Sequence, residues 1–141
     1  MFNLFKKKYS FVVVGPGKIA EKHCKILLTM GHKIASVYSP NSIKNDFFRK
    51  FNFINNLEYL KNIQFDFGLI TSPNKYHKNR IEEFLKLNKP VFVEKPVMIS
   101  SNDFQYIKKK FPNNYSIIFG GFNLRYQKNK YFKKDIKNKK I

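Results

Sequence analysis

A glycine turn directly after an apolar run is the first feature of this sequence that could do chemistry. Three consecutive valines precede the stretch Gly15-Pro16-Gly17-Lys18-Ile19. Gly15 permits a tight turn, and Gly17 has no side chain to hold a ligand away from the backbone. The free N–H groups at the start of a following helix would face an anion. The stretch therefore predicts a phosphate-binding turn between a buried strand and a helix.

A second polar segment, Thr71-Ser72-Pro73-Asn74, follows another apolar run, and His77 lies three positions further on. In an open α/β sheet, ligands bind beyond the carboxyl ends of the strands. We therefore expect this segment at the same edge of the sheet as the glycine turn. His77 is expected at the start of a helix there, near any bound dinucleotide.

Two opposite charges and a proline, Glu94-Lys95-Pro96, come directly after the apolar residues 91–93. Charged side chains directly after a buried strand are unusual for residues that have only a structural role. Lys95 could move a proton in a reaction. It could also pair only with Glu94 or with a cofactor ribose, and the local sequence leaves these alternatives open.

The segment Ser39-Pro40-Asn41-Ser42 has no acidic residue, although it follows a predicted strand. In NAD-binding turns, an Asp or Glu at this place binds the ribose hydroxyls of the adenosine. Ser39 and Ser42, with Lys44 nearby, could instead accept a 2′-phosphate, which favours NADP slightly over NAD. A capped turn that opens the next helix explains the same residues equally simply.

Alternating strands and helices must position these residues. The predicted strands cover residues 9–14, 33–38, 53–54, 65–70, 91–93 and 116–119, and the predicted helices cover 18–30, 43–51, 57–62, 75–88 and 102–110. This alternation predicts an α/β protein with a doubly wound parallel sheet and right-handed crossovers. We expect the Rossmann dinucleotide-binding fold, in three α/β/α layers, over residues 1–124. Residues 125–141 form a basic tail.

Two predicted helices have side chains whose placement matters for the site and the core. In the helix at 18–30, His23 lies beside an apolar stripe that contains Cys24, which favours a packed histidine over a ligand. The helix at 102–110 is expected to begin at a serine cap at 100 or 101. The side chains expected to point inward from it and from its end are Phe104, Ile107 and Phe111.

Composition narrows the function classes. The net charge is +19, but the lysines are spread along the whole chain, so we expect no nucleic-acid binding and only electrostatic steering of anionic ligands. The single cysteine excludes an internal disulfide and a multi-cysteine metal site, and no metal is expected. No apolar run approaches a membrane span, and the amino terminus has no secretion signal. The expected location is cytoplasmic.

With these motifs in order, the chain resembles the amino-terminal half of the Gfo/Idh/MocA oxidoreductases. The glycine turn, followed by His23, is similar to the opening of that family. The segment 71–74 with His77 resembles the loop that lies against the nicotinamide ribose and ring. Glu94-Lys95-Pro96 matches the most specific signature of the family, in which the bond before the proline is cis.

A fourth motif lies further along the chain. Residues 121–126, which include Asn123 and Arg125, resemble the segment that crosses into the second domain of the family. The resemblance implies an NAD(P)-dependent dehydrogenase that transfers a hydride to or from a hydroxyl-bearing carbon of a sugar, an inositol or a related polyol. Lys95 would be catalytic, because it would bind that hydroxyl and help to move its proton. The implied cofactor-binding residues are Gly15, Pro16, Gly17, Lys18, Ile19, Ser39, Thr71, Ser72, Pro73, Asn74, His77, Glu94, Lys95, Asn123 and Arg125.

The chain departs from the family after these motifs. Family members continue into a second α/β domain, which supplies the substrate pocket and a partner for the lysine. Residues 125–141 have only enough apolar side chains for one amphipathic helix. We therefore expect a truncated or split form that a complementing chain, or a homo-oligomer, would have to complete. The alternative is a non-catalytic dinucleotide-binding or interaction module, or a gene remnant.

Overall fold

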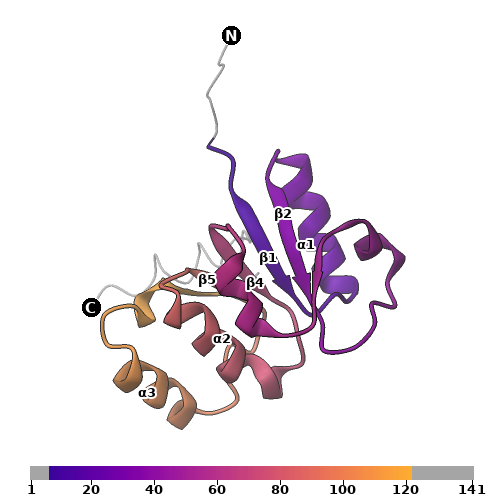
Figure 1. The fold of residues 1–141 in the computed structure, drawn as a ribbon. Helices are drawn as coiled ribbons and strands as arrows, with labels where there is room; N and C mark the ends of the chain where they lie inside the picture. Colours follow the sequence, from indigo (N-terminus) through magenta and orange to yellow (C-terminus); the bar gives the residue numbers. More distant parts are fainter. Residues whose placement is uncertain (1–6, 122–141) are drawn as a thin grey trace, which may run out of the picture.

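Six parallel strands in one sheet form the centre of the molecule (Figure 1), in a computed structural model that describes residues 7–121. The strand order is β3-β2-β1-β4-β5-β6. The strands are β1 (Ser10–Val14), β2 (Lys33–Tyr38), β3 (Phe53–Ile54), β4 (Phe67–Ile70), β5 (Val91–Val93) and β6 (Ile118–Gly120). Every neighbouring pair is parallel. The predicted doubly wound parallel sheet is therefore confirmed.

Three α-helices and four short 3₁₀ helices connect the strands. The α-helices are α1 (Lys18–Thr29), α2 (His77–Lys86) and α3 (Ser101–Lys110), and the 3₁₀ helices are η1 (Asp46–Lys50), η2 (Leu57–Asn62), η3 (Asn74–Tyr76) and η4 (Tyr115–Ile117). In Figure 1, α1 lies on one side of the sheet and α2 and α3 on the other. Within residues 7–121, none of these helices has the length and apolar character needed to cross a membrane.

The central strand β1 explains the three layers. Val12, Val13 and Val14 are completely buried, and successive side chains of a strand point to opposite faces. Val13 packs in the same cluster as Ala20 of α1. Val12 and Val14 belong to the other cluster, which contains Phe84 of α2. A strand covered on both faces has no polar face, which is why its sequence is a continuous apolar run.

The register of the sheet brings the ends of its central strands to one level. Val14 pairs with Tyr38 on one side and with Ile70 on the other. Ile70 in turn pairs with Val93. Because all strands are parallel, the loops that follow β1, β2, β4 and β5 leave the sheet at the same edge. The sheet thus gathers the polar segments that stand far apart in the sequence.

Helix α2 packs directly on β4. A Cβ atom at Gly68 would lie 2.6 Å from the ring of Phe84, closer than any real contact. Phe84 is completely buried, so the ring occupies the space that any other side chain at position 68 would need. This contact fixes the height of α2, and of its first residue His77, above the sheet.

The predicted helix at 43–51 is wrong in type and in extent. The structure has a coil from Ile43 and then the 3₁₀ helix η1. The side-chain oxygen of Asn45 accepts a hydrogen bond from the Phe47 N–H at 3.0 Å, which starts the turn at position 46 instead of 43. Helical spacing in this stretch would bury Ile43, Phe47 and Phe51, but the completely buried ring is Phe48. The serines at 39 and 42 are therefore not the cap of this helix.

Other predicted boundaries differ by a few residues. The strand expected from 65 begins at Phe67. Asp66, just before it, contacts β1 through its N–H, which donates to the Ser10 carbonyl at 2.9 Å, and through its carboxylate, which accepts the Ser10 N–H at 2.8 Å. The strand expected from 116 begins at Ile118, after η4. The helix expected at 75–88 divides into η3 and α2. The remaining strands lie within one residue of the prediction.

Helix α3 confirms one expectation and corrects another. The hydroxyl of Ser100 accepts a hydrogen bond from the Asp103 N–H at 3.2 Å, so the serine cap is confirmed. Ile107 is completely buried, as expected, and Phe111 is partly buried. Phe104 was expected inward but is 41% exposed. Its ring lies edge-on to Tyr115 at the margin of the helix, beside the core instead of within it.

Candidate functional site

A cavity of about 550 Å³ lies at the carboxyl edge of the sheet, between the loops that follow β1, β2 and β4. It brings together seven of the predicted cofactor-binding residues, with three further side chains. The lining residues are Gly15, Pro16, Gly17, Ser39, Asn41, Ser42, Lys44, Thr71, Ser72 and Pro73. None of these ten is acidic, and Lys44 is basic. The cavity therefore suits an anionic ligand.

Gly15 makes the tight turn after β1. Its φ is +90°, in the region that favours glycine, and its N–H donates to the Tyr38 carbonyl at 3.1 Å. A Cβ atom at this position would lie 2.7 Å from both the Cα and the N of Ser72. The turn after β1 and the loop after β4 thus pack backbone against backbone.

Gly17 is the N-cap of α1 and has different surroundings. Apart from its chain neighbours, no atom of residues 7–121 lies within 4 Å of the place where a Cβ would be, and no side-chain hydrogen bond caps the helix there. The first N–H groups of an α-helix have no partner within the helix. At α1 they remain available to a ligand, and the positive end of the helix dipole favours an anion there.

The loop after β4 is fixed to the glycine turn by Thr71. Its hydroxyl lies 3.0 Å from the Val14 carbonyl and 2.8 Å from the Gly15 carbonyl, and its N–H donates to Val14 at 2.9 Å. Ser72, the next residue, is different. Its Oγ is buried and has no hydrogen-bond partner within the described part of the chain. A buried hydroxyl of this kind is a ready contact for a bound polar group.

The first turn of α1 carries one acid, but its charge is compensated. Glu21 pairs with Lys25 at 2.6 Å and accepts a hydrogen bond from Asn45 at 2.9 Å. The bond from Lys25, followed by that from Asn45, lowers the pKa of the Glu21 carboxyl. Two other predicted cofactor-binding residues, Lys18 and Ile19, are exposed at the start of the helix, and 53% of the surface of Ile19 is accessible to solvent.

The segment after β5 is arranged around Glu94. One carboxylate oxygen of Glu94 lies 2.6 Å from His23 Nε2, and the other accepts the Lys95 N–H at 3.2 Å. The side chain of Lys95 is exposed and makes no ion pair with any residue in 7–121. The alternative in which the Lys95 ammonium pairs with Glu94 is therefore not what this structure contains. The Lys95–Pro96 bond is cis, as expected.

His23 was expected to be a packed side chain, and it does pack on a neighbouring ring. Its ring lies against Phe92, with centroids 5.6 Å apart. His23 also contacts Glu94, and sequence reasoning missed this contact because the two residues are 71 positions apart. No local pattern signals such a pair.

His77 lies behind the cavity and does not line it. The side chain is completely buried, with Nδ1 2.9 Å from the Pro96 carbonyl and Nε2 2.7 Å from the Ser72 carbonyl. Asn74 is exposed at the start of η3 and is also not part of the lining. Asn123 and Arg125 lie outside the described residues. Asn41, which sequence reasoning missed, lines the cavity from the loop after β2.

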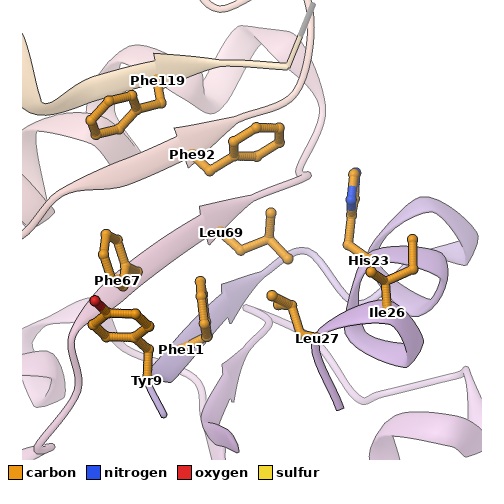
Figure 2. Close-up of a pocket in the computed structure, with 9 residues that line it drawn as sticks. All are labelled: Tyr9, Phe11, His23, Ile26, Leu27, Phe67, Leu69, Phe92 and Phe119. Carbon is orange, nitrogen blue, oxygen red and sulfur yellow. The ribbon is translucent and has the colours of Figure 1, made fainter. Parts of the chain in front are cut away.

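A second hollow, of about 420 Å³, lies on the face of the sheet that carries α1 (Figure 2). It is almost entirely apolar, and its aromatic rings come from four strands or their flanks. The lining residues are Tyr9, Phe11, His23, Ile26, Leu27, Phe67, Leu69, Phe92 and Phe119. Phe119 is 52% exposed. Tyr9 and His23 are its only polar lining residues, and His23 already contacts Glu94, so the polar cavity is the candidate site.

Comparison with known proteins agrees with the geometry. The model of the Gfo/Idh/MocA family, described as an oxidoreductase family with an NAD-binding Rossmann fold, matches residues 9–122. The chain belongs to this family. The resemblance inferred from the motifs is thereby confirmed, and the matched residues form the NAD-binding Rossmann domain of the family. A comparison with curated proteins finds no match.

Solved structures of dehydrogenases share the fold. Scyllo-inositol dehydrogenase from Lactobacillus casei, with bound NAD(H) and scyllo-inositol, has 21% identity and a TM-score of 0.78, over 92% of this chain and 41% of that one. Myo-inositol 2-dehydrogenase from Lactobacillus plantarum has 22% identity and a TM-score of 0.75, over 94% and 42%. The WlbA (WbpB) dehydrogenase from Thermus thermophilus, in complex with NAD and alpha-ketoglutarate, has 20% identity and a TM-score of 0.75, over 94% and 48%. The chain thus spans less than half the length of these relatives.

Proposed function

We propose that this chain binds a nicotinamide dinucleotide at its glycine turn, as part of an NAD(P)-dependent oxidoreductase. The reaction would be hydride transfer to or from a hydroxyl-bearing carbon of a sugar, an inositol or a related polyol. Membership of the family supports the cofactor. The inositol dehydrogenases among the solved structures support the substrate class.

One observation carries the proposal: the cavity at the carboxyl edge has unused bonding capacity. Ser72 Oγ is buried without a partner within the described residues, and α1 begins without a side-chain cap. An unsatisfied buried hydroxyl costs about 1–3 kcal/mol, so a ligand that supplies its hydrogen bond is favoured. The pyrophosphate of a dinucleotide offers acceptors to both groups, and the open space at Gly17 lets it approach the backbone.

The predicted residues then have separate roles. The glycine turn, with Lys18 and Ile19, would hold the pyrophosphate, and Ser39 would face the adenosine ribose. The loop from Thr71 to Asn74 would lie along the nicotinamide riboside. Asn123 and Arg125 stay predicted cofactor contacts.

Lys95 would act on the substrate. A bound nicotinamide supplies or accepts the hydride. The Lys95 ammonium is exposed and without an ion pair among residues 7–121, so it is free to bind the substrate hydroxyl and to move its proton. The groups that bind the rest of the substrate would come from outside residues 7–121, in this chain or in a complementing one.

The choice between NAD and NADP depends on the loop after β2. Ser39, Asn41, Ser42 and Lys44 line the cavity there, and no carboxylate does so among the described residues. A carboxylate at this place binds the 2′-hydroxyl in NAD enzymes, whereas a cation accommodates a 2′-phosphate. Two of the solved relatives contain NAD(H) or NAD. We expect NADPH to bind at least as tightly as NADH, and Lys44→Ala to weaken NADPH more than NADH.

Titration with NADH and NADPH, followed by ligand fluorescence, tests the proposal. Two serine variants give a crossed control. Ser72→Ala should weaken binding without loss of stability, because its hydroxyl has no hydrogen-bond partner among residues 7–121. Ser36→Ala should lower stability without loss of affinity, because its hydroxyl donates to the Asn52 carbonyl. No binding at millimolar cofactor would exclude a dinucleotide site.

A second candidate is a module that binds the dinucleotide without turnover, supported by the exposed apolar hollow beside α1. Hydride transfer with a panel of inositols and sugars separates the two. Lys95→Ala should abolish such transfer and leave cofactor affinity nearly unchanged. Cofactor binding without transfer to any polyol, also after addition of candidate second-domain chains, would favour the non-catalytic module.

A further inference from the structure

The residues on both sides of Lys95 are held by contacts with other elements. Before it, the Glu94 N–H donates to the Ile70 carbonyl at 2.9 Å, and the Glu94 carboxylate contacts His23 of α1. After it, the Pro96 carbonyl contacts His77 at 2.9 Å. Lys95 itself also gives its N–H to Glu94. The backbone at Lys95 is thus fixed, while its side chain remains exposed.

The ring of His77 also reaches the other loop of the site. Its second nitrogen lies 2.7 Å from the Ser72 carbonyl. The hydroxyl of the same serine has no partner in the part of the chain that the structure describes. One side chain therefore joins the segment that carries Lys95 to the loop that borders the cavity. His77 is completely buried, so a ligand in the cavity does not touch it.

The support beneath His77 is rigid. It is the first residue of α2, and the contact between Phe84 and Gly68 leaves no space between this helix and β4. A five-membered ring with a nitrogen on each of two edges can contact two carbonyl groups at a fixed separation. A flexible side chain in its place would hold the loops less firmly, because more freedom would have to be lost on binding.

We propose that His77 is a positioning residue that sets the separation between the Ser72 loop and Lys95, with His23 as a second positioning residue through Glu94. This inference rests on the proposed function, because it assigns the nicotinamide end of the dinucleotide to the space between these two loops. The contacts of His77 with the Pro96 and Ser72 carbonyls arrange that end of the site before a ligand binds. Preorganisation of this kind strengthens binding without a direct contact between His77 and the ligand.

The test compares NADH with ADP-ribose, which has no nicotinamide, by calorimetry. We expect the unmodified chain to bind NADH more tightly. His77→Leu should weaken NADH binding by about tenfold, because the two loops would then have to be ordered when the ligand binds, and it should leave ADP-ribose binding nearly unchanged. His77→Gln keeps N–H donors and should recover part of the loss. His23→Leu should reduce the same preference by a smaller factor.

His32→Leu is the matched control. His32 accepts the Tyr9 N–H at 3.2 Å at the other edge of the sheet. Its replacement should change the affinity for neither NADH nor ADP-ribose. Circular dichroism establishes that each variant is folded, and His23→Leu provides the test if His77→Leu does not fold. An equal loss for both ligands, or none in folded variants, overturns the positioning role. Failure of the unmodified chain to bind either ligand overturns the proposed function itself.

Discussion

Gly15 and Gly17 stand in the same turn, but they are glycines for different reasons. Gly15 has a φ of +90°, and a Cβ there would meet the Ser72 backbone at 2.7 Å. We expect Gly15→Ala to lower the free energy of unfolding by about 1–3 kcal/mol, because strain and steric overlap both oppose it. Urea denaturation measures this change.

Gly17→Ala should have the opposite profile. Among the described residues, nothing except its chain neighbours lies within 4 Å of its Cβ position, and its φ of −95° suits any residue. Stability should therefore stay within about 0.5 kcal/mol of the unmodified chain. The added methyl group would occupy the space a pyrophosphate needs, so NADH affinity should fall. Equal destabilisation by both alanines would contradict this distinction.

Cys24 gives a prediction about alkaline stability. Burial raises the pKa of its thiol to about 12 from the usual 9.0. Above pH 9 the unfolded chain loses this proton while the folded chain keeps it, so the unfolded state binds fewer protons and stability falls as pH rises towards 12. Cys24→Ala should therefore flatten the decline by up to about 1.4 kcal/mol per pH unit. Denaturant titrations above pH 9 measure this difference. If the free energy of unfolding declines equally with pH in the unmodified chain and in Cys24→Ala, the raised thiol pKa is wrong.

The residues of the site were predictable to different degrees. The turn at Gly15, the segment from Thr71 and the Glu94-Lys95-Pro96 motif are local patterns, and the sheet brings their elements to one edge. The contacts of His23 and His77 depend on how separate elements approach each other. Their types were visible in the sequence, but their partners became visible only in the packed structure.

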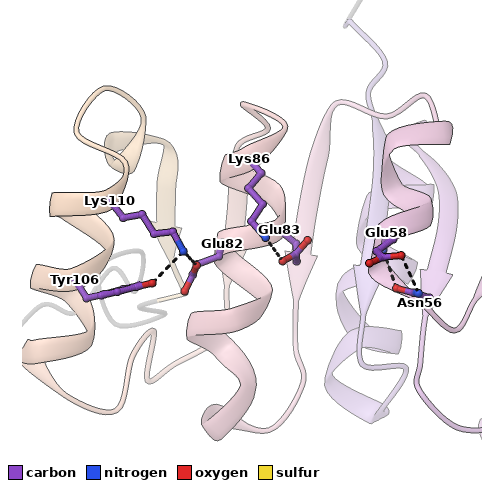
Figure 3. Close-up of polar contacts among 7 residues, drawn as sticks. All are labelled: Asn56, Glu58, Glu82, Glu83, Lys86, Tyr106 and Lys110. Atoms are coloured by element: carbon purple, nitrogen blue, oxygen red, sulfur yellow. Dashed lines mark hydrogen bonds and ion pairs between the residues drawn. The ribbon is translucent and has the colours of Figure 1, made fainter.

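At the scale of elements, a polar network around Lys110 joins α2 and α3 (Figure 3), and Lys78 and Asp103 form a second ion pair between the two helices. Lys110 contacts Glu82 at 2.5 Å and the Tyr106 hydroxyl at 3.0 Å. The hydrogen bond that Lys110 donates to Glu82, followed by the one it donates to the Tyr106 hydroxyl, raises the pKa of the Lys110 ammonium. Glu82 is 8% exposed, so water competes weakly for its carboxylate.

Two neighbouring glutamates on α2 test the value of this network. Glu82→Gln should lower stability by about 1–2 kcal/mol, because it removes a charge-assisted hydrogen bond in a shielded place. Glu83, whose partner Lys86 is largely exposed, is the matched control. Glu83→Gln should cost no more than about 0.5 kcal/mol. Equal effects in thermal unfolding would mean that the helix contact does not depend on Glu82.

Elements were predicted best where apolar runs decide them. The strands at 33–38, 53–54 and 91–93 have the predicted bounds. In β2 and β5 the sheet buries apolar side chains such as Val37, Val91 and Val93, whereas β3, at the edge of the sheet, is not buried. The prediction of a helix at 43–51 was wrong because apolar residues have similar spacing in an α-helix and in a 3₁₀ turn over so few residues. There the choice was made by one side-chain bond, from Phe47 N–H to Asn45, and by the packing of Phe47, Phe48 and Phe51 on one another.

At the scale of the whole molecule, the charge of +19 should oppose the compact state. The described exposed pairs, such as Arg49 with Asp46, each contribute only about 0.2–1 kcal/mol, so repulsion among the lysines should dominate. We expect the melting temperature to rise with sodium chloride, since the screening length falls to about 10 Å at 0.1 M. A lower melting temperature with added salt would show that ion pairs dominate instead.

The order of the strands has a consequence for how the chain reaches its native state. β1 pairs with β2 and with β4, but β2, β3 and three connections, which contain α1, η1 and η2, separate β1 from β4 in the sequence. The pairing of β1 with β4 therefore forms only once those segments have been placed. Until then one backbone edge of the most apolar strand, Val12 to Val14, is unpaired. Late, long-range pairing slows folding and leaves such edges open to other chains. Recovery from denaturant should therefore fall as protein concentration rises, and it should be most complete in dilute solution.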